Sequence, residues 1–202
     1  MFDSPQSIYH HPTKKFFFSM DKNKTESIAI KVHPAVFRYL DSNFPKTGGA
    51  YDIRKHFLHD FLRAGLTRQP DTEKPSKAFH GFHEINVVFT QRDCRQNGFS
   101  ISESHQAAFS RLAYKFIQQT ACQEVLYAHV AGGIPRDTAI KEYLLENLYE
   151  EHELNYAALR KYYQRNWMEA ERRVTEEYAE LTGRKQLIRS IIISTKNVPF
   201  YK

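Results

Sequence analysis

Alternating apolar and polar residues mark the extended segments of this chain. Between Ser27 and His33, isoleucine or valine occupies every second position, at 28, 30 and 32. A period of two places these side chains on one face, so the segment predicts a half-buried strand. Further strands are predicted over Glu84–Thr90 (EINVVFT) and Leu187–Ser194 (LIRSIIIS). The pattern therefore predicts three short strands that lie far apart in the chain.

Helical spacing of apolar residues dominates the rest of the sequence. After Ser102 and Ser104, for example, Phe109, Leu112 and Phe116 recur at intervals of three and four. This spacing gives one apolar helix face, and either serine can cap its N-terminus. Helices are predicted over Ala35–Asn43, Tyr51–Gly65, most of His105–Val130, Thr138–Leu148 and Asn155–Glu180. The predicted fold class is α+β, predominantly helical, with short strands and a helical C-terminal half.

Glycine and proline positions suggest how the chain is divided. Gly183 is predicted to end the last helix, and Asn97-Gly98 is predicted to form a turn within Arg92–Phe99. Residues 1–26 show no period and form a predicted N-terminal arm. The polar stretch Thr67–Phe82 contains Pro70 and Pro75 and is the best candidate for a linker.

That linker separates two predicted units. A strand–helix–helix unit occupies 27–68, and a strand followed by helices occupies 83–202; the alternative is one continuous domain. The order strand, helix, helix starts from both Ser27 and Glu84. No residue-level repeat accompanies it, which favours two common segments over a duplication.

Composition narrows the choice of partner. The net charge is +6 and the isoelectric point is near 9.2, which favours polyanions, with nucleic acid first and an acidic membrane surface second. The two cysteines, Cys94 and Cys122, form neither a disulfide framework nor a C-x-x-C pair, so we expect a reducing, cytoplasmic location. No window resembles a secretory signal or a membrane span, so no membrane association is expected.

The first unit resembles a known family of DNA-binding proteins. SIAIKVHPAVFRYLDSNF followed by YDIRKHFLHDFLRAGL, within Ser27–Leu66, is similar to the ribbon-helix-helix repressors of bacteria and phages. The resemblance implies a two-stranded ribbon made by a dimer, whose outward residues Ala29, Lys31 and His33 enter a major groove. The alternative is an ordinary strand followed by two core helices.

A second segment, Thr138–Trp167, resembles the helix-turn-helix DNA-binding proteins. Its first helix has an apolar face, and an acidic turn, Glu150–Glu153, precedes a second helix that Asn155 can cap. The resemblance implies that this second helix reads a groove. The alternative is a solvated basic helix face that pairs with the neighbouring acidic residues.

The side chains of the second helix suit DNA recognition. Arginine can donate two hydrogen bonds to guanine, glutamine reads adenine, and lysine and tyrosine bind phosphates. Tyrosines among arginines also suit stacking on unpaired bases of single-stranded DNA. The predicted nucleic-acid-binding residues are Lys31, Asn155, Tyr156, Arg160, Lys161, Gln164, Arg165, Arg172 and Arg173.

Signals for catalysis are weak. His80 and His83 lie three residues apart, but this spacing matches no standard zinc motif. Neither a nucleophile elbow nor a phosphate loop is present, so we predict no enzyme activity, no catalytic residue, no metal and no cofactor.

Three functions follow from these observations. The first is a DNA-binding accessory or regulatory protein for transcription, replication or recombination in a bacterial or phage system. It would bind double-stranded DNA, and a homodimer would match symmetric sites. The second is a non-enzymatic structural or protein-interaction protein, and the third is a metal-dependent nuclease that uses the His80/His83 cluster.

Overall fold

The computed structural model describes residues 24–69 and 82–196, with side-chain environments up to residue 183. The strands are β1 (Thr25–Val32), β2 (Lys46–Thr47), β3 (Ala50–Tyr51), β4 (Leu66–Thr67), β5 (His83–Thr90) and β6 (Ser100–Ile101). The helices are α1 (Pro34–Asn43), α2 (Phe57–Ala64), α3 (Gln91–Asn97), α4 (Glu103–Val130), α5 (Arg136–Glu146), α6 (Tyr156–Asn166) and α7 (Met168–Lys196). The predominantly helical α+β class is thereby confirmed.

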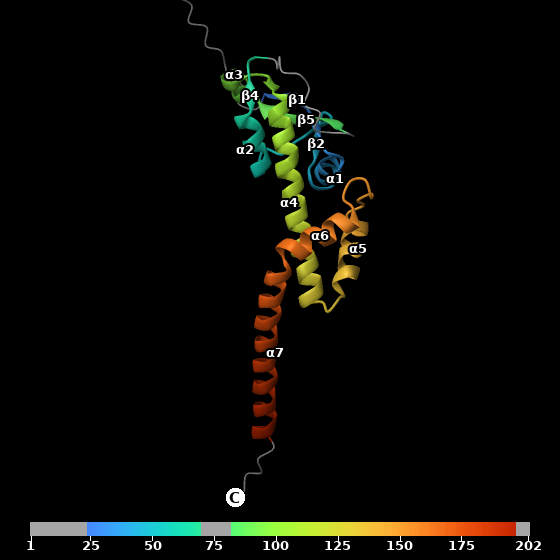
Figure 1. Ribbon diagram of the computed structural model, residues 1–202. Coiled ribbons are helices and arrows are strands. Elements are labelled where there is room, and N and C mark those ends of the chain that lie inside the picture. The colour runs from blue at the N-terminus through green and yellow to red at the C-terminus, as the bar shows by residue number, and fades with distance from the viewer. Residues whose placement is uncertain (1–23, 70–81, 197–202) are drawn as a thin grey trace, which may run out of the picture.

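The long helix α4 is the axis of the molecule (Figure 1). One end packs against β1, α1 and α2, and the other end packs against α5, α6 and the start of α7. Ser102 caps α4, because its hydroxyl accepts a hydrogen bond from the amide of His105 at 3.2 Å. Phe109, Ile117 and Cys122 are fully buried along its length, so a single core runs from the sheet to α6.

A small sheet lies at one end of α4. Its strand order is β1-β5-β3-β2, and β1 and β5 pair antiparallel over eight residues each. Ile28, Ile30 and Val32 are buried, whereas Ala29 and Lys31 are exposed, so the predicted period of two is confirmed. The short strands β4 and β6 form a separate antiparallel pair.

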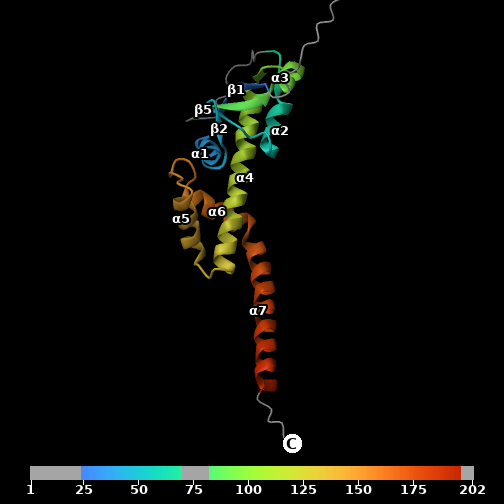
Figure 2. The same cartoon turned by 180° about the vertical axis from the view of Figure 1, so that it is seen from behind.

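The helix α7 leaves the body at its base and extends away from it, as both views show (Figures 1 and 2). The predicted strand Leu187–Ser194 is wrong, because these residues form the last turns of α7. Gly183 therefore lies inside a helix instead of ending one. A glycine in a helix costs only about 1 kcal/mol relative to alanine, which the helix formers around it can offset.

Other boundaries also differ from the prediction. Most of Arg92–Phe99 is the helix α3, and Gly98 of the predicted Asn97-Gly98 turn follows it with a φ of 129°. The helix predicted over Tyr51–Gly65 begins only at Phe57, because Ala50–Tyr51 forms β3. The long helix predicted over Asn155–Glu180 is interrupted at Trp167. Most of the predicted arm and linker, at 1–23 and 70–81, lies outside the described residues.

Candidate nucleic-acid interface

The ribbon-helix-helix resemblance implies a ribbon of two strands from two chains, but here both strands belong to one chain. In the antiparallel register of β1 and β5, Ala29 lies opposite Asn86 and Lys31 lies opposite Glu84. The strand β1 leads into α1 and then α2, and β5 leads into α3 and then α4. The expected dimer-made ribbon is therefore corrected to an intrachain ribbon between two strand–helix–helix segments.

The outward face of this ribbon is polar. Ser27, Ala29 and Lys31 of β1 are exposed, and so are Glu84 and Asn86 of β5. Further along β5 the outward position is occupied by Val88, which is buried. The open part of the face is therefore the half that surrounds the Ala29–Asn86 pair.

Lys31, a predicted DNA-binding residue, is held at one edge of the ribbon. Its amide donates a hydrogen bond to Gln106 Oε1 at 2.8 Å, which occupies the free edge of β1. Its Nζ lies 3.6 Å from Glu103 Oε1, and the side chain remains about half exposed. An exposed pair of this kind contributes little to stability, so the ammonium can exchange its partner for a phosphate.

His33 does not take the outward position that the resemblance implies. It precedes α1, and its Nδ1 accepts a hydrogen bond from the amide of Ala35 at 3.2 Å. The ring also lies edge-on to Tyr114, with 4.8 Å between ring centroids. Burial lowers the pKa of this imidazole, so His33 is a helix cap and not a groove-facing cation.

The second candidate surface differs from the predicted helix-turn-helix geometry in its connection. The helices α5 and α6 are separated by residues 147–155, whereas helix-turn-helix motifs use turns of about three or four residues. Glu153 in this connection is buried, accepts a hydrogen bond from the Glu150 amide, and pairs with Arg38 Nε at 3.3 Å. The acidic connection is therefore anchored to α1.

The helix α6 separates its side chains by face. Leu159 and Tyr163 are buried, whereas Lys161, Gln164 and Arg165 are exposed. These three predicted residues therefore share a solvent-facing surface, which a groove-reading helix requires.

The predicted residues at the start of α6 are engaged within the protein. The side-chain oxygen of Asn155 accepts hydrogen bonds from the amides of Ala157 and Ala158, at 2.7 and 3.2 Å. The ring of Tyr156 lies 5.6 Å from Lys141 Nζ, at cation–π distance. The predicted cap is present, but it occupies the very oxygen that base reading would use.

Three predicted arginines form ion pairs with acidic residues of the same chain. Arg160 Nε lies 3.2 Å from Asp137 Oδ1. Arg172 and Arg173 both contact Glu169, at 2.9 and 3.2 Å, and Arg172 also contacts Glu176. The continuous positive run expected from Arg160 to Arg173 is thus partly neutralised, as the solvated-face alternative describes.

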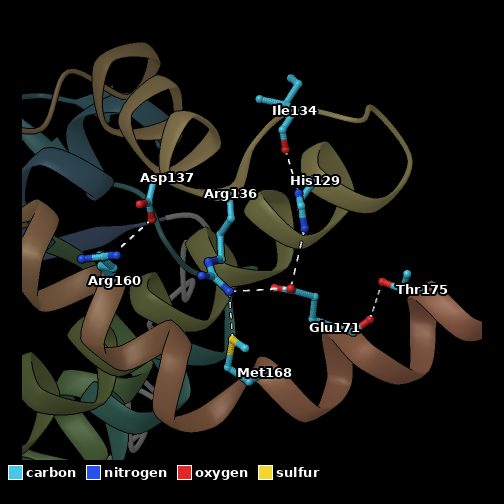
Figure 3. A network of polar contacts seen from close by, with 8 residues as sticks. All are labelled: His129, Ile134, Arg136, Asp137, Arg160, Met168, Glu171 and Thr175. Atoms are coloured by element: carbon cyan, nitrogen blue, oxygen red, sulfur yellow. Dashed lines mark hydrogen bonds and ion pairs between the residues drawn. The ribbon is translucent and has the colours of Figure 1, made fainter.

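The sequence did not predict a polar network that lies at the base of α7 (Figure 3). The carboxylate of Glu171 lies 3.6 Å from His129 Nε2 of α4 and 3.7 Å from Arg136 of α5. Arg136 also donates to the sulfur of Met168 at 2.9 Å and lies over the ring of Tyr163. Burial and the nearby Glu171 carboxylate raise the pKa of the Tyr163 hydroxyl, so that hydroxyl stays neutral.

This network fixes the start of α7 against three other helices. An open hollow of about 800 Å³ beside it is lined by both Arg165 and Arg172 and by Glu169, Glu171 and Glu176. Because both acidic and basic side chains line this hollow, it favours neither an anionic nor a cationic ligand. His129 and Glu171 are more than 40 positions apart in sequence, and no local pattern brings them together.

No protein-family model, no curated protein and no solved structure matches it. Function therefore rests on the described residues themselves.

Those residues offer no assembled centre for metal chemistry. Within 24–69 and 82–196, no group of three or more His, Cys, Asp or Glu side chains could hold a metal ion. His83 stacks on Phe37 with ring centroids 4.5 Å apart, and His80 lies outside the described residues. No helix in the same ranges is long and apolar enough to cross a membrane.

Proposed function

We propose that this protein is a DNA-binding accessory or regulatory protein that contacts double-stranded DNA through the outward face of the β1–β5 ribbon. The observation that carries the proposal is the intrachain antiparallel ribbon, in which each strand leads into a pair of helices. A two-stranded ribbon is narrow enough to enter the major groove of B-DNA. Ribbon-helix-helix proteins use this element for recognition, and one chain here supplies both strands.

The exposed side chains of the ribbon suit the chemistry of a groove. Asn86 can hydrogen-bond adenine in a bidentate manner, and Ala29 opposite it can contact a thymine methyl group. Lys31 provides a cation at the ribbon edge for guanine or for a phosphate. The short strand β3 flanks β5 at Val87 and Gln106 occupies the edge of β1 at Lys31, so the outward face of the ribbon would approach the groove.

Exposed polar residues of α6 offer an additional contact. Lys161, Gln164 and Arg165 are exposed on one helix and would add phosphate contacts on a long duplex. The net charge of +6 favours such sequence-independent attraction. Both cysteines are buried free thiols, which suits the cytoplasmic location that this function requires.

Binding to duplex DNA at two salt concentrations tests the function as a whole. Fluorescence anisotropy with a duplex of random sequence should give affinity that falls steeply between about 50 and 200 mM salt, because bound phosphates release counterions. No binding at the lower salt with micromolar protein would reject DNA as the partner.

Two matched lysine variants then locate the contact. Lys31→Ala and Lys161→Ala each remove one exposed positive charge, from the ribbon and from α6 respectively. We expect Lys31→Ala to weaken binding and to reduce the salt slope by about one, with a smaller effect for Lys161→Ala. The reverse order would reject the ribbon and assign DNA binding to α6.

A second function, protein interaction, is favoured by one specific feature. The helix α7 projects from the body and is largely solvent-exposed along its described part. An interaction through α7 would not depend on DNA binding.

A further inference from the structure

The part of α7 beyond its base is largely exposed as far as its side chains are described, to Gly183. From Arg172 to Gly183, every residue is exposed except Val174 and Thr182, which are partly buried. Tyr178 and Leu181 are 48% and 55% exposed. At 1.5 Å per residue, the 29 residues of α7 extend over about 44 Å, well beyond the hollow at its base. An isolated helix of this kind gains most of its stability from a partner surface.

The residue pattern of α7 describes that partner surface. Positions 178, 181, 185, 188 and 192 follow one another at intervals of three and four, and place Tyr178, Leu181, Ile188 and Ile192 along one helix face. Val174, one step earlier, is partly buried and packs against the core of its own chain. The spacing is that of a coiled-coil seam, and Lys185 is its single charged position. One polar residue in such a seam fixes the register and the number of helices.

The charge of α7 changes sign along its length. Residues 168–183 contain five glutamates and two arginines, whereas residues 184–196 contain four basic residues and no acidic one. Two copies aligned in parallel would bring like charges together. Two copies aligned antiparallel would place the acidic half of each helix beside the basic half of the other, which is favourable.

We propose that α7 is a self-association surface that pairs antiparallel with α7 of a second copy of this chain. The seam from Tyr178 to Ile192 supplies the apolar contact, and the opposite charges of the two helix halves set the direction. The two-fold axis passes at the level of residue 183, so that position 178 of each helix lies opposite position 188 of the other. The body of each protomer remains outside the pairing.

Sedimentation equilibrium of the full chain between about 1 and 100 μM tests the pairing. The expected result is a monomer–dimer equilibrium. Ile188→Asp should raise the dimer dissociation constant at least about tenfold, because it places a charge in the seam. The matched control is Leu145→Asp on α5, where an exposed leucine lies outside the seam; it should leave the constant unchanged. An unchanged unfolding midpoint of the body shows that each variant is folded.

Cysteine cross-linking tests the direction. Tyr178→Cys and Ile188→Cys replace seam positions on either side of the proposed axis, and both native cysteines are buried. Antiparallel pairing predicts a disulfide when the two variants are mixed, and little when either is oxidised alone. A parallel dimer would give the opposite result and overturn the proposal.

Two other outcomes also overturn it. One is a chain that stays monomeric at about 100 μM. The other is a monomer whose Ile188→Asp variant loses binding to anionic lipid vesicles or to duplex DNA, because another partner then covers α7. The Lys31→Ala variant separates the two proposals. If it weakens DNA binding and leaves the dimer dissociation constant unchanged, the DNA contact and the pairing of α7 are independent properties.

Discussion

The helices α4 and α7 have almost the same length, 28 and 29 residues, but opposite surroundings. Ten residues of α4 are buried, on several of its faces, because the sheet, α1, α2, α5 and α6 surround it. Within 168–183 of α7, none is buried. Two helices of similar length therefore have different roles: α4 organises the core, and α7 presents a surface.

The local chemistry of each helix agrees with its place. In α4, alanines at 107, 113 and 121 are buried and allow neighbours to approach closely. In α7, Glu169 pairs with Arg172 and Arg173, and Arg172 pairs with Glu176, all within one or two turns. Such pairs stabilise a helix by about 0.2–0.5 kcal/mol each without any tertiary contact. The exposed helix is therefore stabilised in part by pairs within itself.

The largest expected contrast between the two helices is in core stability. Phe109→Ala in α4 removes a fully buried ring and should lower the free energy of unfolding by about 3–5 kcal/mol. Tyr178→Ala in α7 should change it by less than about 0.5 kcal/mol. Urea denaturation of both variants provides the measurement. Equal losses would mean that α7 is part of the core.

Thiol reactivity compares the same helices without disturbing their packing. Burial raises the pKa of the Cys122 thiol in α4 to about 12, from 9.0. At pH 8 the reactive thiolate is then about a thousandfold rarer than for an unperturbed thiol, so alkylation of the native protein should be correspondingly slow. A cysteine introduced by Thr175→Cys in α7 should react at the ordinary rate. Comparable rates at both sites would contradict the burial of Cys122.

A glycine at the α2–α4 contact provides a smaller test. A Cβ at Gly65 would lie 2.0 Å from Cδ2 of His105, at the start of α4. That ring cannot move freely, because Nε2 hydrogen-bonds the Phe61 carbonyl at 2.8 Å and the ring stacks on Phe61. Gly65→Ala should destabilise the protein by about 1–3 kcal/mol in thermal or urea unfolding. A neutral effect would show that the contact is loose.

The matching substitution in α7 should act in the opposite direction. A Cβ at Gly183 would meet no atom within 4 Å. Gly183→Ala should therefore stabilise the helix by about 0.5–1 kcal/mol, because glycine loses more backbone entropy. Slower hydrogen exchange of α7 amides would report it, and faster exchange would contradict it.

The sequence predicted the elements whose signals are local. The alternation at Ile28, Ile30 and Val32 identified β1, and Ser102, one of the two serines predicted as a cap, begins α4. The run Ile191–Ile193 misled the prediction, because a short apolar run fits a strand and a helix equally well. The assignment of 187–194 as a strand also hid the seam of α7, which becomes visible only when the helix continues past Gly183.

Less of the candidate site than of the fold could be predicted from the sequence. The types of residue on α6 were readable, but their ion pairs were not, because Arg160 meets Asp137 across 23 positions. The pairing of β1 with β5 joins segments about 60 residues apart, and no local rule specifies it. Long-range contacts of this kind depend on the whole core.

The intrachain origin of the ribbon has a consequence for any target it reads. A ribbon formed by two identical chains has a two-fold axis and requires a palindrome. Here one strand presents Ser27, Ala29 and Lys31, and the other presents Glu84 and Asn86, so the two strands are chemically unlike. A target matched to this ribbon has a polarity: reversing the duplex sequence gives a different site. A substitution in one strand would alter one position of that site and leave its mirror position unchanged.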